Sequence, residues 1–136
     1  MKYLKISDFC ITPNPIPQEI ADKILAFHII PLCHVQCNYN HDIMVSEKSG
    51  YRPFTYEKSK GRAGTSEHCF QGKGAVDITS DGHLETLLSD LFTLTEYTRI
   101  CYYPDKGFIH CDYKDNKRSY WEADKNGKWV FKKWLK

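Results

Sequence analysis

The fold class is decided by residues 97–131, which read YTRICYYPDKGFIHCDYKDNKRSYWEADKNGKWVF. Four segments of this stretch are rich in β-branched and aromatic residues and are separated by turn-forming residues; they are 97–103, 108–113, 119–123 and 129–131. The last two are joined through Asn126-Gly127, a pair that favours a tight hairpin turn. The stretch therefore predicts consecutive strands of an antiparallel sheet.

Before this stretch, apolar residues recur mainly at the spacing of an α-helix. Ile20, Ile24 and Phe27 recur at intervals that place them on one face of a helix, which Pro31 is expected to kink or interrupt. A second helix is predicted over residues 81–94, with Leu84, Leu87, Leu88 and Leu91 on its buried side. Helices that precede a sheet are typical of the α+β class.

Short β-prone runs at 43–45 and 75–78 flank a polar, glycine-rich segment up to Gly74, which we interpret as a long ordered loop. The length of 136 residues fits one domain over residues 1–136. We therefore predict an α+β domain with a central antiparallel sheet, helices packed on one side of it and a metal site on the sheet face.

Composition excludes several classes. Hydrophobic residues make up 41% and charged residues 26%, which is a globular and not a disordered balance. The formal net charge is +2, too small to indicate nucleic-acid binding, although basic residues gather in the last twenty positions. That tail suits an anionic cell wall or a solvated surface. The tryptophans and tyrosines of the same region fit either a sugar- or peptide-binding wall or core filling.

Targeting signals are missing from the start, and no later stretch approaches the roughly 20 apolar residues of a membrane span. We therefore expect a protein made in the cytoplasm without a membrane partner. The six cysteines form no CxxC pair and are expected to be reduced thiols.

Candidate metal ligands are His68, Asp77 and His110. A catalytic zinc ion takes three protein ligands and leaves one position for water. His68 ends the glycine-rich loop, Asp77 lies on the predicted strand after it, and His110 lies on the strand 108–113. Asp112, two residues beyond His110, would share its strand face.

The residues around these candidates form four ordered motifs: Ser49–Pro53, Thr65–His68, Gly72–Ile78 and Phe108–Asp112. Together they resemble the pattern S-G-[YF]-R, then S-x-H-x-x-G-x-A-x-D, then a closing His near a carboxylate. This is the pattern of the zinc D-Ala-D-Ala carboxypeptidase and murein endopeptidase family, which has a hedgehog-like metallopeptidase fold. The sequence around Tyr102–Asp112 looks most like its murein endopeptidase and phage branches.

The resemblance implies that His68, Asp77 and His110 bind Zn²⁺ and that Arg52 steadies the substrate oxyanion. It also implies substrate contacts for Tyr51 and Ser66, although the Ser66 hydroxyl could equally satisfy nearby backbone. The implied reaction is metal-assisted hydrolysis of peptidoglycan stem or cross-link peptides that contain D-amino acids. The implied enzyme acts as a monomer and reaches the wall through a phage lysis system.

Two positions depart from the family pattern. Eight residues separate His68 from Asp77 where the family usually has six, and the extra pair is expected to bulge from the loop. Gly107 stands where many members carry the general base, three residues before the closing His. Asp112 is the first candidate for a replacement base and Asp105 the second, although Asp112 could instead orient a metal ligand.

Two other functions compete with this prediction. A catalytically inactive zinc-containing module that binds the cell wall or builds a phage structure would explain Gly107. An intracellular dipeptidase on the same scaffold is the second.

Overall fold

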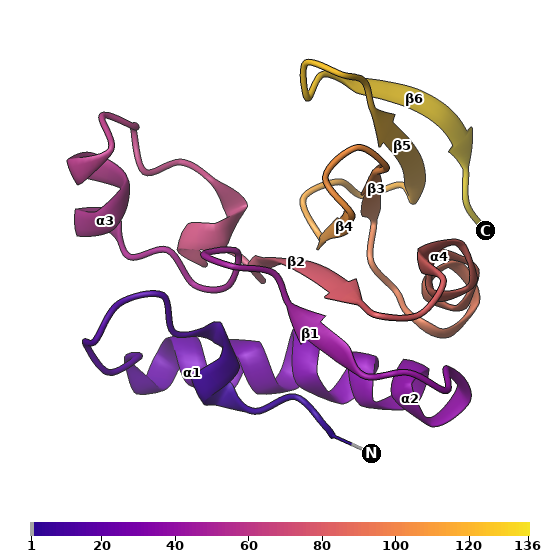
Figure 1. Ribbon diagram of the computed structural model, residues 1–136. Coiled ribbons are helices and arrows are strands. Elements are labelled where there is room, and N and C mark those ends of the chain that lie inside the picture. Colours follow the sequence, from indigo (N-terminus) through magenta and orange to yellow (C-terminus); the bar gives the residue numbers. More distant parts are fainter. Residues whose placement is uncertain (1) are drawn as a thin grey trace.

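A single six-stranded sheet organises the molecule, for which a computed structural model describes residues 2–136 (Figure 1). The strands stand in the order β1-β2-β4-β3-β5-β6. Their bounds are β1 (Ile43–Val45), β2 (Ala75–Ser80), β3 (Arg99–Tyr103), β4 (Phe108–Asp112), β5 (Ser119–Ala123) and β6 (Trp129–Trp134). The predicted α+β class is thus confirmed.

The sheet is mixed, whereas the sequence predicted an antiparallel one. β3 and β5 run parallel, and the four other neighbouring pairs are antiparallel. The reason is that β2 already occupies the outer edge of β4, so the chain leaving β4 must add β5 to the free edge of β3. A backbone hydrogen bond of 2.8 Å from the Ser119 N–H to the carbonyl of Thr98 lies at the start of this parallel pairing.

One long helical segment lies along the sheet (Figure 1). It consists of α1 (Gln18–Ile24), the π-helical turn η2 (Leu25–Ile29) and α2 (Ile30–Asn38). Pro31 does not end the helix, because the preceding turn widens to absorb the missing N–H. The carbonyl of Phe27, four residues earlier, instead accepts a hydrogen bond of 2.7 Å from the Tyr113 hydroxyl.

Shorter helices complete the chain. α4 (Leu84–Leu94) agrees with the predicted second helix, with Leu87, Leu88 and Leu91 buried. α3 (Phe54–Ser59) and the 3₁₀ turn η3 (Glu67–Cys69) lie within the segment predicted as an irregular loop, and a 3₁₀ turn, η1 (Ile6–Phe9), precedes α1. α3 escaped prediction because its single turn and a half carries too few apolar residues for a helical pattern.

The two faces of the sheet differ in chemistry because side chains alternate along each strand. On one face, apolar residues of the strands pack against apolar residues of the helices. The strand residues are Val76, Ile78, Ile100 and Ile109, and the helix residues are Ile24, Leu32, Val35, Leu87 and Leu91. The intervening residues Asp77, His110 and Asp112 point to the opposite face. The core therefore holds the strands in place while their polar side chains meet on the other side.

The helical segment Gln18–Asn38 also bears on the membrane expectation. Its length and apolar composition would suffice for a membrane span, and 28% of its most apolar part is buried. Length and composition of this kind are also found in core helices of soluble proteins, and Ile24, Leu32 and Val35 contribute to the core here. The absence of a membrane partner therefore stays a prediction.

Candidate metal centre

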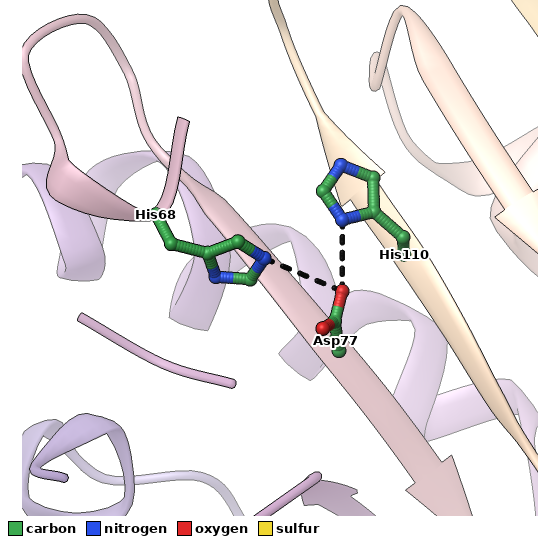
Figure 2. Close-up of side chains that lie close together, drawn as sticks. All are labelled: His68, Asp77 and His110. Carbon is green, nitrogen blue, oxygen red and sulfur yellow. Dashed lines mark hydrogen bonds and ion pairs between the residues drawn. The ribbon is translucent and has the colours of Figure 1, made fainter. Parts of the chain in front are cut away.

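Three buried side chains, His68, Asp77 and His110, converge on the polar face of the sheet (Figure 2). One potential ligand atom from each lies within 4.8 Å of the other two. Oδ1 of Asp77 is 3.4 Å from Nε2 of His68 and 2.8 Å from Nδ1 of His110. Two imidazole nitrogens and one carboxylate oxygen are a donor set that zinc takes, and their spacing fits a single ion.

Sheet register and loop contacts bring these side chains together. Asp77 on β2 pairs directly with His110 on β4, so their side chains share one face. His68 comes from η3, where its N–H donates to the Ser66 hydroxyl at 3.2 Å and its carbonyl accepts from Arg52 N–H at 2.8 Å. The motif segments 49–53 and 65–68 are thus joined at the centre.

The outward nitrogens of both imidazoles are held by acceptors. Nδ1 of His68 lies 3.1 Å from the carbonyl oxygen of Gly50, and Nε2 of His110 lies 2.7 Å from Oδ2 of Asp112. Because a carbonyl or a carboxylate can only accept, each of these nitrogens carries the proton. The inward nitrogens are the ones left to bind a metal, which is the usual way a protein fixes the tautomer of a histidine ligand.

Electrostatics favour cation binding. Burial alone would raise the pKa of the Asp77 carboxyl, but hydrogen bonds from His110 and His68 hold it well below its usual range. Burial likewise opposes protonation of His110, whereas hydrogen bonds with Asp112 and Asp77 raise its pKa to about 9. The His110 ring lies between the carboxylates of Asp77 and Asp112, so positive charge is favoured at this position. A divalent cation bound there would compete with the proton for Nδ1 of His110.

Arg52 lies beside the centre. Its Nη2 is 4.0 Å from Oδ2 of Asp77, and its Nε donates to the carbonyl of Lys48 at 3.0 Å. The guanidinium is therefore fixed next to the ligand carboxylate.

Asp112 is fully buried and fully engaged. Arg99 donates to both of its oxygens, at 2.9 Å from Nε to Oδ1 and 2.5 Å from Nη2 to Oδ2. The backbone N–H of Lys114 adds a bond of 3.0 Å, and His110 supplies the fourth contact. Although burial works in the opposite direction, these bonds keep the pKa of Asp112 well below its usual range. Such surroundings suit a carboxylate that orients His110.

The remaining predicted residues lie further out. Asp105 is exposed in the turn between β3 and β4, five residues before His110. The Tyr51 ring packs edge-on against the buried Phe70, with 6.0 Å between centroids. The structure thus brings Ser66 and Arg52 to the centre and leaves Asp105 outside it.

The eight-residue spacing between His68 and Asp77 forms an outward bulge, as the sequence predicted. Phe70 takes a left-handed backbone conformation with φ of 58° and buries its ring, while Gln71–Lys73 are exposed. Gly74 has φ of 85°, and a Cβ there would meet the Phe70 ring at 2.1 Å. Buried His28 fastens the bulge, because its Nε2 lies 2.9 Å from the carbonyl oxygen of Lys73.

A pocket of about 210 Å³ adjoins His110. Its lining includes Ser66, Glu67, Arg99, Lys114 and Trp129. Sequence reasoning missed Glu67 and Arg99 as residues of the site. The position of Arg99 depends on its pairing with Asp112 across β3 and β4, for which the sequence carries no signal.

Comparison with known proteins gave one match. A family model described as Peptidase M15 matches residues 4–112. No curated protein and no solved structure matches. The matched residues include the three converging side chains, and they end before β5 and β6 begin.

Proposed function

The chain belongs to the peptidase M15 family, and from this premise we propose that it is a zinc peptidase that hydrolyses peptidoglycan stem or cross-link peptides containing D-amino acids. The observation that carries the proposal is the convergence of His68, Asp77 and His110 within 4.8 Å. Their tautomers and charge states suit a divalent cation, and the family is zinc-dependent.

When bound by these residues, zinc supplies an activated water and polarises the substrate carbonyl. The chain's own groups complete the chemistry. Arg52, held near Asp77, is placed to stabilise the oxyanion that develops on the carbonyl oxygen. A fixed guanidinium acts more strongly on this charge than on the neutral ground state, so Arg52 contributes to the rate of the reaction.

Acceptance of the water proton needs a carboxylate with a free lone pair. The two oxygens of Asp112 are taken up by Arg99, Lys114 and His110, so we propose that Asp112 positions His110 and is not the base. Glu67 is the one carboxylate among the described residues that line the pocket beside His110. We propose that Glu67 accepts the proton in place of an acid at position 107.

Three variants separate these roles. Glu67→Gln should lower kcat on a peptide by about 100-fold or more while zinc affinity is kept. Asp112→Asn should weaken zinc binding, and Asp105→Asn should change neither quantity. Loss of kcat in Asp105→Asn with full activity in Glu67→Gln would contradict the assignment.

The function itself is tested by digesting purified cell-wall sacculi with wild-type protein and with His110→Ala, followed by mass spectrometry of the released peptides. We expect peptide release that requires zinc and His110. Equal release by both proteins would refute a zinc peptidase. Binding of zinc and sacculi without release would favour the inactive wall-binding module, and cleavage of free D-Ala-D-Ala alone would favour the dipeptidase.

A further inference from the structure

Four large aromatic side chains line one face of the β5–β6 hairpin: Trp121, Trp129, Phe131 and Trp134. Successive ring centroids lie 6.0 Å apart from Trp129 to Trp121, 5.4 Å from Trp121 to Phe131 and 4.9 Å from Phe131 to Trp134. Phe131 is 41% and Trp134 57% exposed, so the rings at the outer end do not fill a core. We call these four residues the aromatic strip.

A β-bulge creates the strip. Trp121 pairs with Phe131, yet Tyr120 pairs with Lys133, so one extra residue of β6, Lys132, is inserted between these pairs. Without it, Trp134 would point to the opposite face, because side chains alternate with period two. The bulge therefore places Trp134, the partner of Ser119, on the same face as Phe131.

The strip continues the face that carries the metal centre. Cross-strand pairing runs from Asp77 to His110, from His110 to Cys101, from Cys101 to Trp121 and from Trp121 to Phe131. In addition, the Trp129 ring contacts His110 edge-on, with 5.1 Å between centroids. A long polymer lying on the strip would reach the metal centre without changing face.

Cations stand at both ends of the strip. The Arg99 guanidinium lies 4.9 Å from the Trp129 ring centroid, and Nζ of Lys117 lies 4.5 Å from that of Trp134. Exposed Lys132 and Lys133 lie on β6, the edge strand of the sheet. Lysines on an edge strand oppose pairing with a second copy. Because the charge of Arg99 is paired with Asp112, Lys117 is the cation left at the strip to meet a ligand. Stacked aromatic faces with a cation at the outer end suit a ligand with flat apolar faces and negative charge.

We infer that the aromatic strip binds the glycan strand of the cell wall. Sugar rings offer C–H faces that stack on indole and phenyl rings, and wherever the stem peptide has been removed the free lactyl carboxylate of muramic acid complements Lys117. The inference rests on the proposed function for the identity of the polymer. The strip lies on the C-terminal hairpin, outside the residues that match the family model.

The test measures binding to glycan strands from which an amidase has removed all peptides, and to an N-acetylglucosamine hexamer. All three tryptophans of the chain belong to the strip, so their fluorescence reports binding directly, with calorimetry as a second readout. The double variant Phe131→Ala, Trp134→Ala should bind bare strands about tenfold more weakly or worse. Val130→Ala is the matched control, because Val130 is 43% exposed on the other face of β6.

A second variant guards against misfolding of the double variant. Lys117→Glu changes one exposed charge and should weaken binding of the muramic acid strands by several-fold while leaving binding of the uncharged hexamer unchanged. Equal affinity of wild type and double variant for bare strands would overturn the inference. The inference would also be overturned if the wild-type protein bound single-stranded DNA but not glycan. It would likewise be overturned if sedimentation showed that the protein self-associates through the strip.

Failure here is distinguishable from failure of the proposed function. Bare glycan contains no peptide bond, so its binding does not depend on hydrolysis. A protein that releases peptides from sacculi but ignores bare strands refutes the glycan inference alone. A protein that binds bare strands but releases no peptide would refute the proposed peptidase activity and would support glycan binding by the strip.

Discussion

At the scale of single residues, Gly50 shows how tightly the metal centre is built. Its carbonyl accepts a hydrogen bond from Nδ1 of His68, and a Cβ at this position would lie 2.6 Å from the Phe9 backbone. If the backbone at Gly50 moved away from Phe9 to make room for a Cβ, the carbonyl that accepts the hydrogen bond from His68 would move with it. The glycine of the Ser-Gly-Tyr-Arg motif is therefore required for the close packing that positions the carbonyl next to His68.

We predict that Gly50→Ala lowers the free energy of unfolding by about 1–3 kcal/mol and weakens zinc binding. Gly72→Ala is the matched control, because a Cβ at Gly72 would meet nothing within 4 Å. Urea denaturation and zinc titration measure the two effects. Wild-type zinc affinity in Gly50→Ala would show that the Gly50 carbonyl does not hold His68.

Asp112 gives the second prediction at this scale. Asp112→Asn should reduce zinc affinity about 10- to 100-fold, because the hydrogen bond that fixes the His110 tautomer loses its charge and Arg99 loses its partner. A competitive zinc chelator measures the change. An unchanged affinity, with loss of kcat alone, would restore Asp112 as the general base.

The sequence predicted His68, Asp77, His110 and Arg52 because their motifs are local and ordered along the chain. It could not settle the role of Asp112, which depends on Arg99 thirteen residues away. That contact exists because β3 and β4 pair in one particular register. A shift of one residue would turn Arg99 to the other face.

At the scale of elements, the tie between the long helix and the loop before β2 depends on His28. This imidazole is fully buried, with Nδ1 2.9 Å from the Tyr97 hydroxyl and Nε2 2.9 Å from the Lys73 carbonyl oxygen. Burial lowers its pKa from 6.5 to about 4, despite the opposing hydrogen bond to Lys73. The folded protein therefore keeps His28 neutral where the unfolded chain would protonate it.

Stability should consequently fall as the pH falls from 6.5 towards 4. Between these values the unfolded state binds more protons than the folded one, and the loss from His28 amounts to about 2.5 kcal/mol at pH 4.5. Urea denaturation at pH 7 and pH 4.5 measures it. His28→Gln should be less stable at pH 7 yet lose less on acidification, and an identical loss in both proteins would contradict the prediction.

Most elements were predictable because their patterns are regular. β5 was predicted at its observed bounds, and β4 and α4 differ from prediction only at their ends. The parallel pairing of β3 with β5 was not predictable, since it depends on which strand edge remains free. The π turn before Pro31 depends likewise on the distant Tyr113 hydroxyl.

At the scale of the whole molecule, the metal should act as a cross-link. His68, Asp77 and His110 come from η3, β2 and β4, so the unfolded chain cannot offer the same set of ligands. At 100 times Kd, zinc should add about 2.7 kcal/mol to the free energy of unfolding and raise Tm by roughly 10 °C.

Thermal denaturation with zinc and with a chelator measures this effect. His68→Ala should abolish the shift, whereas His34→Ala should retain it because His34 is exposed on α2. A shift that survives in His68→Ala would place the ion elsewhere.

The turn between β3 and β4 has a final consequence. Gly107 there has φ of 75°, and its carbonyl accepts a hydrogen bond of 2.7 Å from the Thr79 hydroxyl. A side chain at 107 would meet no atoms, but this backbone would cost a non-glycine residue about 1–2 kcal/mol. A carboxylate introduced at position 107 would therefore have room for its side chain but would carry this backbone cost, which a redesign of the turn would remove.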